Sequence, residues 1–415
     1  MKEARLEDIR ALPQRLRPAQ RLALDLAISA ALALTSVAWA STVPLTYSVF
    51  KGMRNMMLMP SIIFCFLFLL PKIRSRLFLR GAFLWLLLVL YAFLLSNLTH
   101  SASLTSSMEV LLFFMIVVIF FFFLSLSKDE VISDRAMTII FFFILGVFIF
   151  TANAQGILWG PPPVFVFSSE TFGSEDNLSY SLGASRFYGL GAVIAAIMWR
   201  KQKKPMLWVV FLIASLFMLG LCLIAGGRGE AVITALILLF RVGAIRIILI
   251  ILPLISLISL FFDASQIITR ENLVIIDRFS YLQNSAGQRD ILLLQVIDLL
   301  SNELRCFFMG CGYSYFQHYY NFSYGFYPHN IIAEFIIVFG FPIFFTMSGL
   351  AIVGARKIFA NGANRNYMLL LLYFFLIGLK SGTLTQAWFA VGGLLHLSMI
   401  GLVELSRSYP DRSRH

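Results

Sequence analysis

Arginine and histidine are gathered between Arg270 and Gly340, the longest stretch of this chain without a clean membrane-spanning pattern. Arginine suits phosphate because its planar fork donates two parallel charge-assisted hydrogen bonds. Histidine accepts a proton from a hydroxyl near pH 7. The stretch therefore indicates a site that binds a phosphate group and activates a hydroxyl. Its arginines and histidines are Arg270, Arg278, Arg289, Arg305, His318 and His329.

Aromatic residues accompany this basic set and offer flat faces that suit sugar rings. An aromatic belt at a membrane interface is an equally good explanation for each of them. Tyr313 and Tyr327 are the candidates among them for acceptor or sugar binding. The wider set is Trp159, Tyr313, Tyr315, Tyr319, Tyr320, Tyr324 and Tyr327.

A second motif is Tyr-Pro-His329-Asn330 with Glu334 four residues beyond the asparagine. Proline disfavours helix at the residue before it, so a helix is predicted to begin near His329 or Asn330. His329 then lies at the mouth of the next span, and Glu334 lies about one turn deeper. The alternative is an interfacial histidine that only caps the helix.

Several familiar sites are absent from the sequence. It contains no Walker A motif, no HExxH, no GxSxG, and no pair of closely spaced aspartates of the kind that holds a metal. No acidic residue lies deep in a predicted span beside an ion-coupling partner, which disfavours a proton-coupled transporter. We therefore expect neither a metal nor another cofactor.

Composition places these residues in a membrane protein. The chain has 415 residues, of which 59% are hydrophobic and 13% charged, whereas a soluble domain is about a quarter charged. The sequence predicts an all-α polytopic membrane protein of about twelve spans. The predicted spans are residues 23–48, 55–71, 81–97, 108–126, 136–152, 187–199, 206–225, 231–240, 247–262, 331–354, 367–383 and 385–404.

The distribution of charge predicts the topology. The formal charge of +12 fits the positive-inside bias better than nucleic-acid binding. Both termini are placed inside, so that residues 1–22 form a basic arm and residues 405–415 a tail. Nine spans then occupy 23–262, with an outer loop at 153–186. A large, partly helical outer loop at 263–330 precedes the last three spans at 331–404. Six arginines in or next to the outer loops and the Gly226–Glu230 turn break the charge rule: Arg186, Arg228, Arg270, Arg278, Arg289 and Arg305. The phosphate candidates among them are Arg186, Arg228, Arg278 and Arg289.

The cysteines show no zinc-binding spacing. Cys65 and Cys222 lie in apolar runs and are expected in the core. Cys306 and Cys311 share the large loop, where we expect two free or buried thiols. A disulfide between them is the alternative if the loop lies in an oxidising compartment.

Several motifs together resemble the O-antigen polymerase and O-antigen ligase family of bacterial surface-polysaccharide assembly. Ala-Gly-Gly-Arg228-Gly-Glu resembles the family's Ser-Arg-Gly turn, with glycine where serine is commoner. Ala-Gly-Gln-Arg289, followed by Gly-Cys-Gly-Tyr313, resembles the start of its large loop. His329-Asn330 with nine residues before Gly340 resembles the ligase-type histidine motif. Arg186-Phe-Tyr-Gly also resembles a family arginine. The resemblance covers about residues 186–345.

The resemblance implies an inverting, metal-independent glycosyltransferase of the bacterial inner membrane with its active site on the periplasmic face. Its donor would be an undecaprenyl-diphosphate-linked glycan. Arg228 and Arg289 would bind the diphosphate, with Arg186 and Arg278 as weaker candidates. The catalytic residues would be His329, which takes the proton of the acceptor hydroxyl, and Glu334, which holds the imidazole in one tautomer. Asn330, Tyr313 and Tyr327 would bind the acceptor or sugar.

The acceptor distinguishes two activities within the family. A polymerase uses the sugar of a second lipid-linked repeat, and a ligase uses the core sugar of lipid A. The high phenylalanine content and modest loop favour polymerase, whereas the histidine motif favours ligase, although Ile343 departs from the ligase pattern. The expected partners are the lipid bilayer and both glycans, and the resemblance allows a chain-length regulator. A lipid-linked sugar transporter and a scaffold subunit remain alternatives from other classes.

Overall fold

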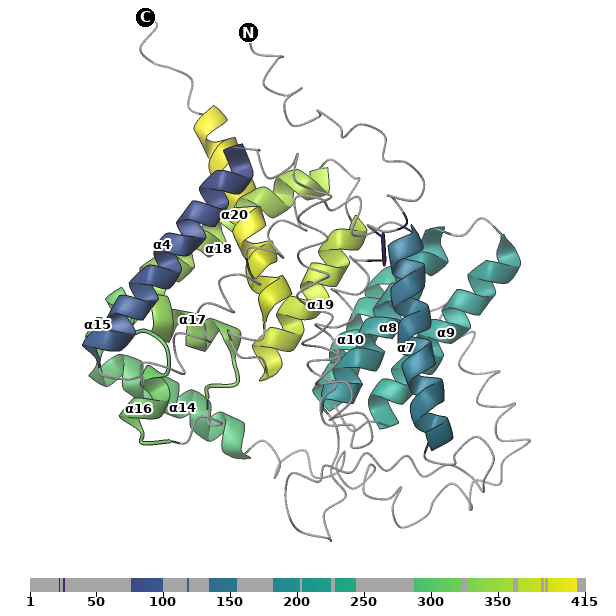
Figure 1. Cartoon of the computed structure of the whole chain (residues 1–415), viewed down its shortest axis with the longest axis horizontal. Coiled ribbons are helices and arrows are strands. Elements are labelled where there is room, and N and C mark those ends of the chain that lie inside the picture. Colours follow the sequence, from purple (N-terminus) through teal and green to yellow (C-terminus); the bar gives the residue numbers. More distant parts are fainter. Residues whose placement is uncertain are drawn as a thin grey trace, which may run out of the picture. The chain divides into compact units, whose positions relative to one another are not determined.

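The computed structural model describes a set of helices and their connections (Figure 1). Within the described residues every regular element is a helix and none is a strand. The all-α prediction is therefore confirmed for this part of the chain. The described ranges are 76–99, 134–154, 182–201, 204–224, 228–243, 287–322, 327–360, 365–381 and 387–408, with Leu22, Asp25, Leu26, Val118 and Leu384.

The chain divides into two compact units, each of which is described by itself. Unit 1 comprises Met1–Arg17, Phe68–Asp129 and Ala286–His415, and unit 2 comprises Pro18–Leu67 and Glu130–Ser285. Unit 1 contains α4 (Arg76–Leu98), α14 (Gly287–Asn302), α15 (Leu304–Met309), α16 (Tyr315–Tyr319), α17 (Ile331–Phe339), α18 (Phe341–Ala360), α19 (Arg365–Ser381) and α20 (Trp388–Ser408). Unit 2 contains α7 (Asp134–Ala154), α8 (Leu182–Lys201), α9 (Pro205–Ile224) and α10 (Arg228–Val242).

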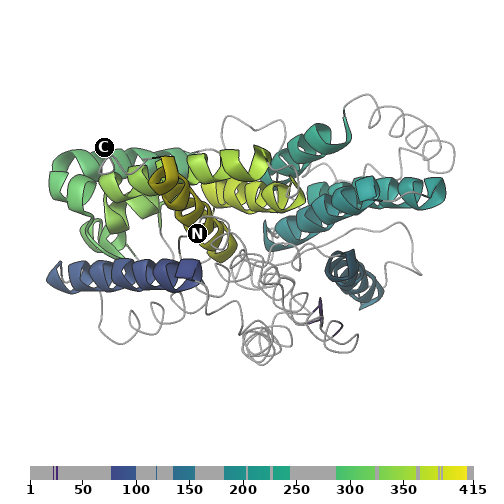
Figure 2. The ribbon, with the colours of Figure 1, turned by 90° about the horizontal axis from the view of Figure 1, so that it is seen from above.

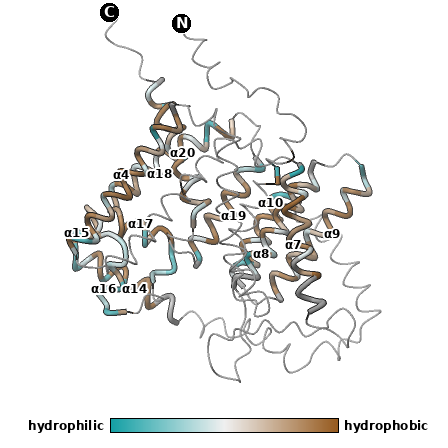
Figure 3. Tube along the Cα trace, in the orientation of Figure 1, coloured by the Kyte–Doolittle hydropathy of each residue, from teal (hydrophilic) through white to brown (hydrophobic). Residues whose placement is uncertain are grey.

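Four of the described helices are long and apolar enough to cross a membrane: Leu77–Leu98, Pro205–Leu223, Phe341–Ala360 and Trp388–Ser406. Figure 3 shows how hydrophobic residues run along them. Large apolar side chains such as Phe83 and Phe345 are more than half exposed on these helices, as expected of surfaces that face lipid. The chain is therefore a membrane protein. The twelve-span count stays a prediction, because the spans 23–48, 55–71, 108–126 and 247–262 lie almost wholly outside the described residues.

The predicted span 331–354 is wrong as a single helix. It is divided at Gly340, whose φ is +90° and where an added Cβ would lie 2.6 Å from the carbonyl oxygen of Phe308. Glycine is the residue that tolerates both the positive φ and this close approach. The nine residues of α17 are too few to cross a bilayer, which takes about 20. The spanning segment is therefore α18.

In unit 2, α8 and α9 form an antiparallel hairpin. Ser185 Oγ donates to the Cys222 carbonyl at 3.0 Å, and Ser215 Oγ donates to the Ala192 carbonyl at 2.9 Å. Further along, the rings of Trp199 and Trp208 lie 5.3 Å apart. Because each serine hydroxyl donates to a carbonyl of the other helix, polar side chains can lie in the interface between two apolar helices. Every described side chain of α8 from residue 185 to 199 is buried.

In unit 1, α18 and α20 run parallel and α19 runs antiparallel to α20. Ser398 Oγ donates to the Met347 carbonyl at 2.8 Å, and Lys357 pairs with Glu404 at 2.7 Å. Residue numbers therefore increase in the same direction along α18 and α20. A Cβ added at Gly354 would clash with the Leu397 carbonyl oxygen. Small residues allow such close backbone approach between membrane helices. Three consecutive spans would alternate in direction in this way.

The expectation of free thiols at Cys306 and Cys311 is wrong, because the two form a disulfide with their Cα atoms 4.8 Å apart. The bond closes the turn after α15, whose last helical residue is Met309. Both cysteines are buried, and so is Cys222, which forms no disulfide with another described cysteine. Cys65 lies outside the described residues.

Candidate active site

The loop after α15 binds the end of α17. The N–H of Cys311 donates to the Ile337 carbonyl at 2.7 Å, and that of Gly312 donates to the Val338 carbonyl at 3.3 Å. These carbonyls belong to the last turn of α17, where a helix has no internal donors. The loop thus satisfies a helix end that would otherwise be buried without partners. We call residues 309–313 together with residues 327–340 the α17 motif.

Two glycines make this contact possible. Gly310 has a φ of +80°, and an added Cβ would lie 2.5 Å from the Val338 carbonyl oxygen. Gly340 faces it, since an added Cβ there would lie 3.0 Å from the Gly310 nitrogen. Both glycines of the sequence motifs are therefore required by backbone packing. The Gly-Cys-Gly and His-Asn motifs are parts of one structural element.

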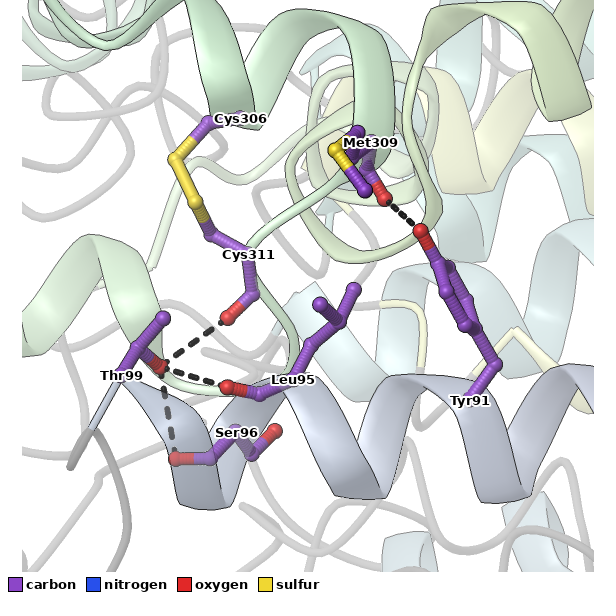
Figure 4. Close-up of a disulfide and its surroundings, with 7 residues drawn as sticks. All are labelled: Tyr91, Leu95, Ser96, Thr99, Cys306, Met309 and Cys311. Atoms are coloured by element: carbon purple, nitrogen blue, oxygen red, sulfur yellow. Dashed lines mark hydrogen bonds between the residues drawn. A yellow bond between two sulfur atoms is a disulfide. The ribbon is translucent and has the colours of Figure 1, made fainter.

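The same loop is held by α4 (Figure 4). The Tyr91 hydroxyl donates to the Met309 carbonyl at 2.5 Å. The Tyr313 N–H donates to Ser96 Oγ at 2.7 Å, and Thr99 Oγ1 donates to the Cys311 carbonyl at 3.2 Å. Sequence reasoning missed Tyr91 and Ser96 of α4 and Thr99, which directly follows the helix. Their signal was a cluster of polar side chains at the end of an apolar run.

The start of α17 holds His329 in an uncommon conformation. Its φ is +53°, a left-handed region that few residues other than glycine occupy, although histidine is among the enriched types. Pro328 before it is buried. Asn330 after it is the helix N-cap, whose side-chain oxygen accepts from Ile332 N at 2.9 Å and Ala333 N at 3.1 Å. The Tyr327 ring lies 3.9 Å from the imidazole, centroid to centroid.

The predicted helix start is therefore confirmed, since α17 begins at Ile331 with Asn330 as its cap. An Asn side chain that accepts two backbone N–H groups stabilises a helix by about 1 kcal/mol. This gives Asn330 a structural contact beside its predicted role in acceptor binding. Tyr327 and His329 are both partly exposed.

Glu334 lies one turn into α17, outside the four candidate spans. Its carboxylate accepts a hydrogen bond from the Leu384 backbone N–H at 2.6 Å. Burial raises the pKa of this carboxyl to about 7, although the Leu384 hydrogen bond opposes the shift. The carboxyl is therefore poised to exchange a proton near neutral pH. Leu384 is a second contact that sequence reasoning missed.

Glu334 also lies near Tyr313. Burial, followed by the charge of Glu334, raises the pKa of the Tyr313 hydroxyl well above its usual value. The Tyr313 ring meets Phe339 edge-on, with centroids 6.2 Å apart. Tyr313 is 5% exposed, so its ring is part of the packing of the α17 motif. The structure thus places the Leu384 N–H on the Glu334 carboxylate. The predicted support of the His329 imidazole by Glu334 stays a prediction.

The predicted arginines divide between the two units. In unit 2, the Arg186 Nε lies 3.4 Å from the Glu230 carboxylate, with side chains 8% and 0% exposed. This buried ion pair joins the start of α8 to the first turn of α10, which begins at Arg228. In unit 1, Arg289 lies in the first turn of α14. Arg278 lies outside the described residues.

Among the described residues, no group of three histidine, cysteine or acidic side chains could hold a metal ion. The polar groups of the α17 motif are histidine, carboxylate, amide and hydroxyl. They suit proton transfer and hydrogen bonding to a hydroxylated ligand.

No protein-family model matches this chain, and comparison with curated proteins and with solved structures gives no match. The resemblance to the O-antigen polymerase and ligase family thus stands on the sequence motifs. It stays a prediction.

Proposed function

We propose that this protein transfers a glycan from a polyprenyl diphosphate to an acceptor hydroxyl at the outer face of a bacterial inner membrane. The observation that carries the proposal is His329, held at a φ of +53° between a buried proline and a helix cap. A strained residue persists when its surroundings enforce it, and such residues gather at functional sites. The polymerase activity is the preferred form, and the ligase activity is the alternative.

The histidine and the disulfide fit this function in different ways. His329 is partly exposed and can meet a substrate, whereas the glycines at the other end of α17 are buried in backbone contacts. Disulfides persist in oxidising compartments such as the bacterial periplasm. The Cys306–Cys311 bond therefore supports an outer location for the α17 motif, in agreement with the sidedness predicted from charge.

In the proposed reaction, His329 Nδ1 or Nε2 accepts the proton of the acceptor hydroxyl. The hydroxyl oxygen attacks the anomeric carbon of the donor from the face opposite the diphosphate. The new carbon–oxygen bond forms as the bond to the diphosphate breaks, so the configuration inverts and the diphosphate leaves with the electron pair. The groups proposed to stabilise its charge are the predicted arginines: Arg228 and Arg289, with Arg186 and Arg278 as weaker candidates.

Electrophoresis of surface polysaccharide from a deletion strain tests the proposal. A core that carries a single repeat unit in the deletion identifies a polymerase. Bare core, with polymer left on the lipid carrier, identifies a ligase. An unchanged ladder contradicts both activities and favours a transporter or a scaffold.

Complementation of that strain tests the residue. We expect His329→Ala to restore no ladder although the protein inserts normally. The matched control is His318→Ala, because His318 is an exposed histidine of α16 with no proposed role. A ladder restored equally by both variants would contradict the role of His329.

A further inference from the structure

Large apolar side chains are exposed on two helices that lie outside the four candidate spans. On α14, Leu294 is 64% and Ile297 is 55% exposed. On α15, Leu304 is 60% and Phe308 is 58% exposed. Contiguous apolar patches of this kind mark surfaces that bind a protein or a membrane. The full set is Ile291, Leu293, Leu294, Ile297, Leu304, Phe308 and Met309.

The rotation of α14 is fixed by contacts on its other sides. Leu292, Val296 and Leu299 are buried in a core that also contains Ile337 of α17. On the exposed side of α14, one turn after Leu294, the Asp298 carboxylate accepts a hydrogen bond from the Tyr320 hydroxyl at 2.8 Å. The helical period of 3.6 residues then turns Leu293, Leu294 and Ile297 away from the core.

The outward face continues from α14 into α15. The N–H of Glu303, between the two helices, still donates to the Leu299 carbonyl at 2.8 Å. Glu303 has non-helical backbone angles, with φ -110° and ψ 73°, so α15 is a separate helix. Its residues Leu304 and Phe308 are exposed, as Ile297 of α14 is.

This face adjoins the surfaces of two candidate spans. The rings of Phe345, Phe341, Phe307 and Phe308 follow one another from α18 into α15, with successive centroids 5.8, 5.0 and 5.0 Å apart. Phe345, at one end of the run, is 66% exposed on the span.

On the other side, Tyr91 of α4 bonds to the Met309 carbonyl. Leu94 and Leu98 follow Tyr91 at helical spacing and are 59% and 74% exposed. The apolar surfaces of α4 and α18 therefore adjoin α15. Figure 1 shows α15 beside the end of α4, with α14 and α16 next to it, and the view from above in Figure 2 is consistent with this arrangement.

We propose that α14 and α15 form an interfacial helix pair whose outward face lies in a lipid bilayer, at the level of the ends of α4 and α18. The occupant is the headgroup and upper acyl region of one leaflet, since the spans that share this surface must meet the same lipid. Residues 289–305 carry two arginines and three acidic residues, so the attraction is apolar and does not depend on anionic lipid. The inference does not depend on the glycosyltransferase activity.

Spin labels on the full-length protein test this in nanodiscs of zwitterionic phosphatidylcholine. Single cysteines at Leu294 and Ile297 are placed in a Cys65→Ser, Cys222→Ser background. Matched labels at Asn302 and His318, two exposed polar positions of α14 and α16, report on water. Thiol titration before labelling confirms that one cysteine is free and that Cys306–Cys311 stays paired.

Oxygen concentrates in the bilayer, whereas a nickel chelate stays in water. Each reagent raises the microwave power needed to saturate the signal of a spin label that it can reach. We expect labels at Leu294 and Ile297 to respond several-fold more to oxygen than to nickel, with the reverse at Asn302 and His318. A response to nickel at all four positions would overturn the inference. Labels at Leu294 and Ile297 shielded from both reagents would also overturn it, because a protein surface would then cover the face.

Discussion

The α8–α9 hairpin of unit 2 and the α17 motif of unit 1 satisfy their buried hydrogen-bonding groups in different ways. Both bury backbone and polar groups among apolar helices. In the hairpin, long regular helices satisfy their own backbone, and Ser185 and Ser215 attach to carbonyls across the contact. In the α17 motif, a helix of nine residues ends on donors supplied by another segment, Cys311 and Gly312.

The difference separates a scaffold from a candidate site. Regular helices need no strained residue, and no described residue of the hairpin has a positive φ. The α17 motif instead contains positive φ values at Gly310, Gly312, Gly340 and His329. Irregular backbone among membrane helices is stable only where protein supplies its hydrogen bonds. Such backbone presents side chains that a straight helix would not.

The largest expected effect on stability concerns the ion pair between Arg186 of the hairpin and Glu230 of α10. Removal of one partner of a buried pair costs about 3–5 kcal/mol because the other charge stays buried. We therefore expect Arg186→Ala to lower the apparent melting temperature in detergent strongly, with Arg186→Met/Glu230→Leu recovering most of the loss. If Arg186→Ala kept wild-type stability and lost only activity, Arg186 would belong with the site instead of the scaffold.

The contribution of Glu334 to the stability of the α17 motif should depend on pH. The pKa of Glu334 is about 7, above the ordinary 4.5, so the folded chain binds a proton that the unfolded chain releases between these values. The resulting stabilisation is fully present below pH 4.5 and is lost as the pH rises through 7, by at most about 3 kcal/mol.

The measurement is thermal unfolding between pH 5 and 8. We expect Glu334→Gln to flatten the fall in melting temperature, because the amide oxygen still accepts from Leu384 N but does not titrate. The control Glu303→Gln should leave the wild-type fall unchanged. An identical pH dependence in wild type and Glu334→Gln would refute the assignment.

Two glycines offer a direct comparison of the backbones. We expect Gly310→Ala to destabilise the protein by about 1–3 kcal/mol, because its φ is +80° and its new Cβ would meet the Val338 carbonyl. Gly220→Ala in α9 meets nothing within 4 Å and should stabilise by up to about 1 kcal/mol. Melting temperatures of the two variants check this. Equal effects would mean that the α17 motif is as tolerant as the hairpin.

The smallest expected effect concerns the cap. Asn330→Ala should destabilise the protein by about 1 kcal/mol, whereas Asn330→Asp, which still accepts from the N–H groups of α17, should be nearly neutral. Thermal unfolding measures the stability, and glycan transfer by both variants shows whether Asn330 also contacts the acceptor. Full activity in Asn330→Ala would show that Asn330 caps α17 and does not contact the acceptor.

The sequence predicted the helical class well because apolar runs dominate it. The helix start at His329–Asn330 was also predictable, since proline and asparagine act locally. The break at Gly340 was harder to predict, because it depends on contact with Phe308, which is distant in sequence. A continuous apolar run does not reveal such a contact.

Pairings between distant residues account for the remaining differences. Cys306 and Cys311 carry no signal that separates a disulfide from two thiols, because only the turn after α15 brings them together. The partner of Arg186 lies 44 residues away in Glu230, and that of Glu334 lies 50 residues away in the backbone of Leu384. Charge patterns identified these side chains as unusual but could not give their contacts.

The most direct test of the central claim is glycan transfer by purified protein in nanodiscs, measured as release of polyprenyl diphosphate from a lipid-linked repeat unit. His329→Asn should keep the wild-type melting temperature, because asparagine also accepts a positive φ, and should lose about 10²- to 10⁴-fold in rate. His318→Ala should match wild type in both. Undiminished transfer by His329→Asn at wild-type stability would contradict the claim that the α17 motif presents a catalytic histidine.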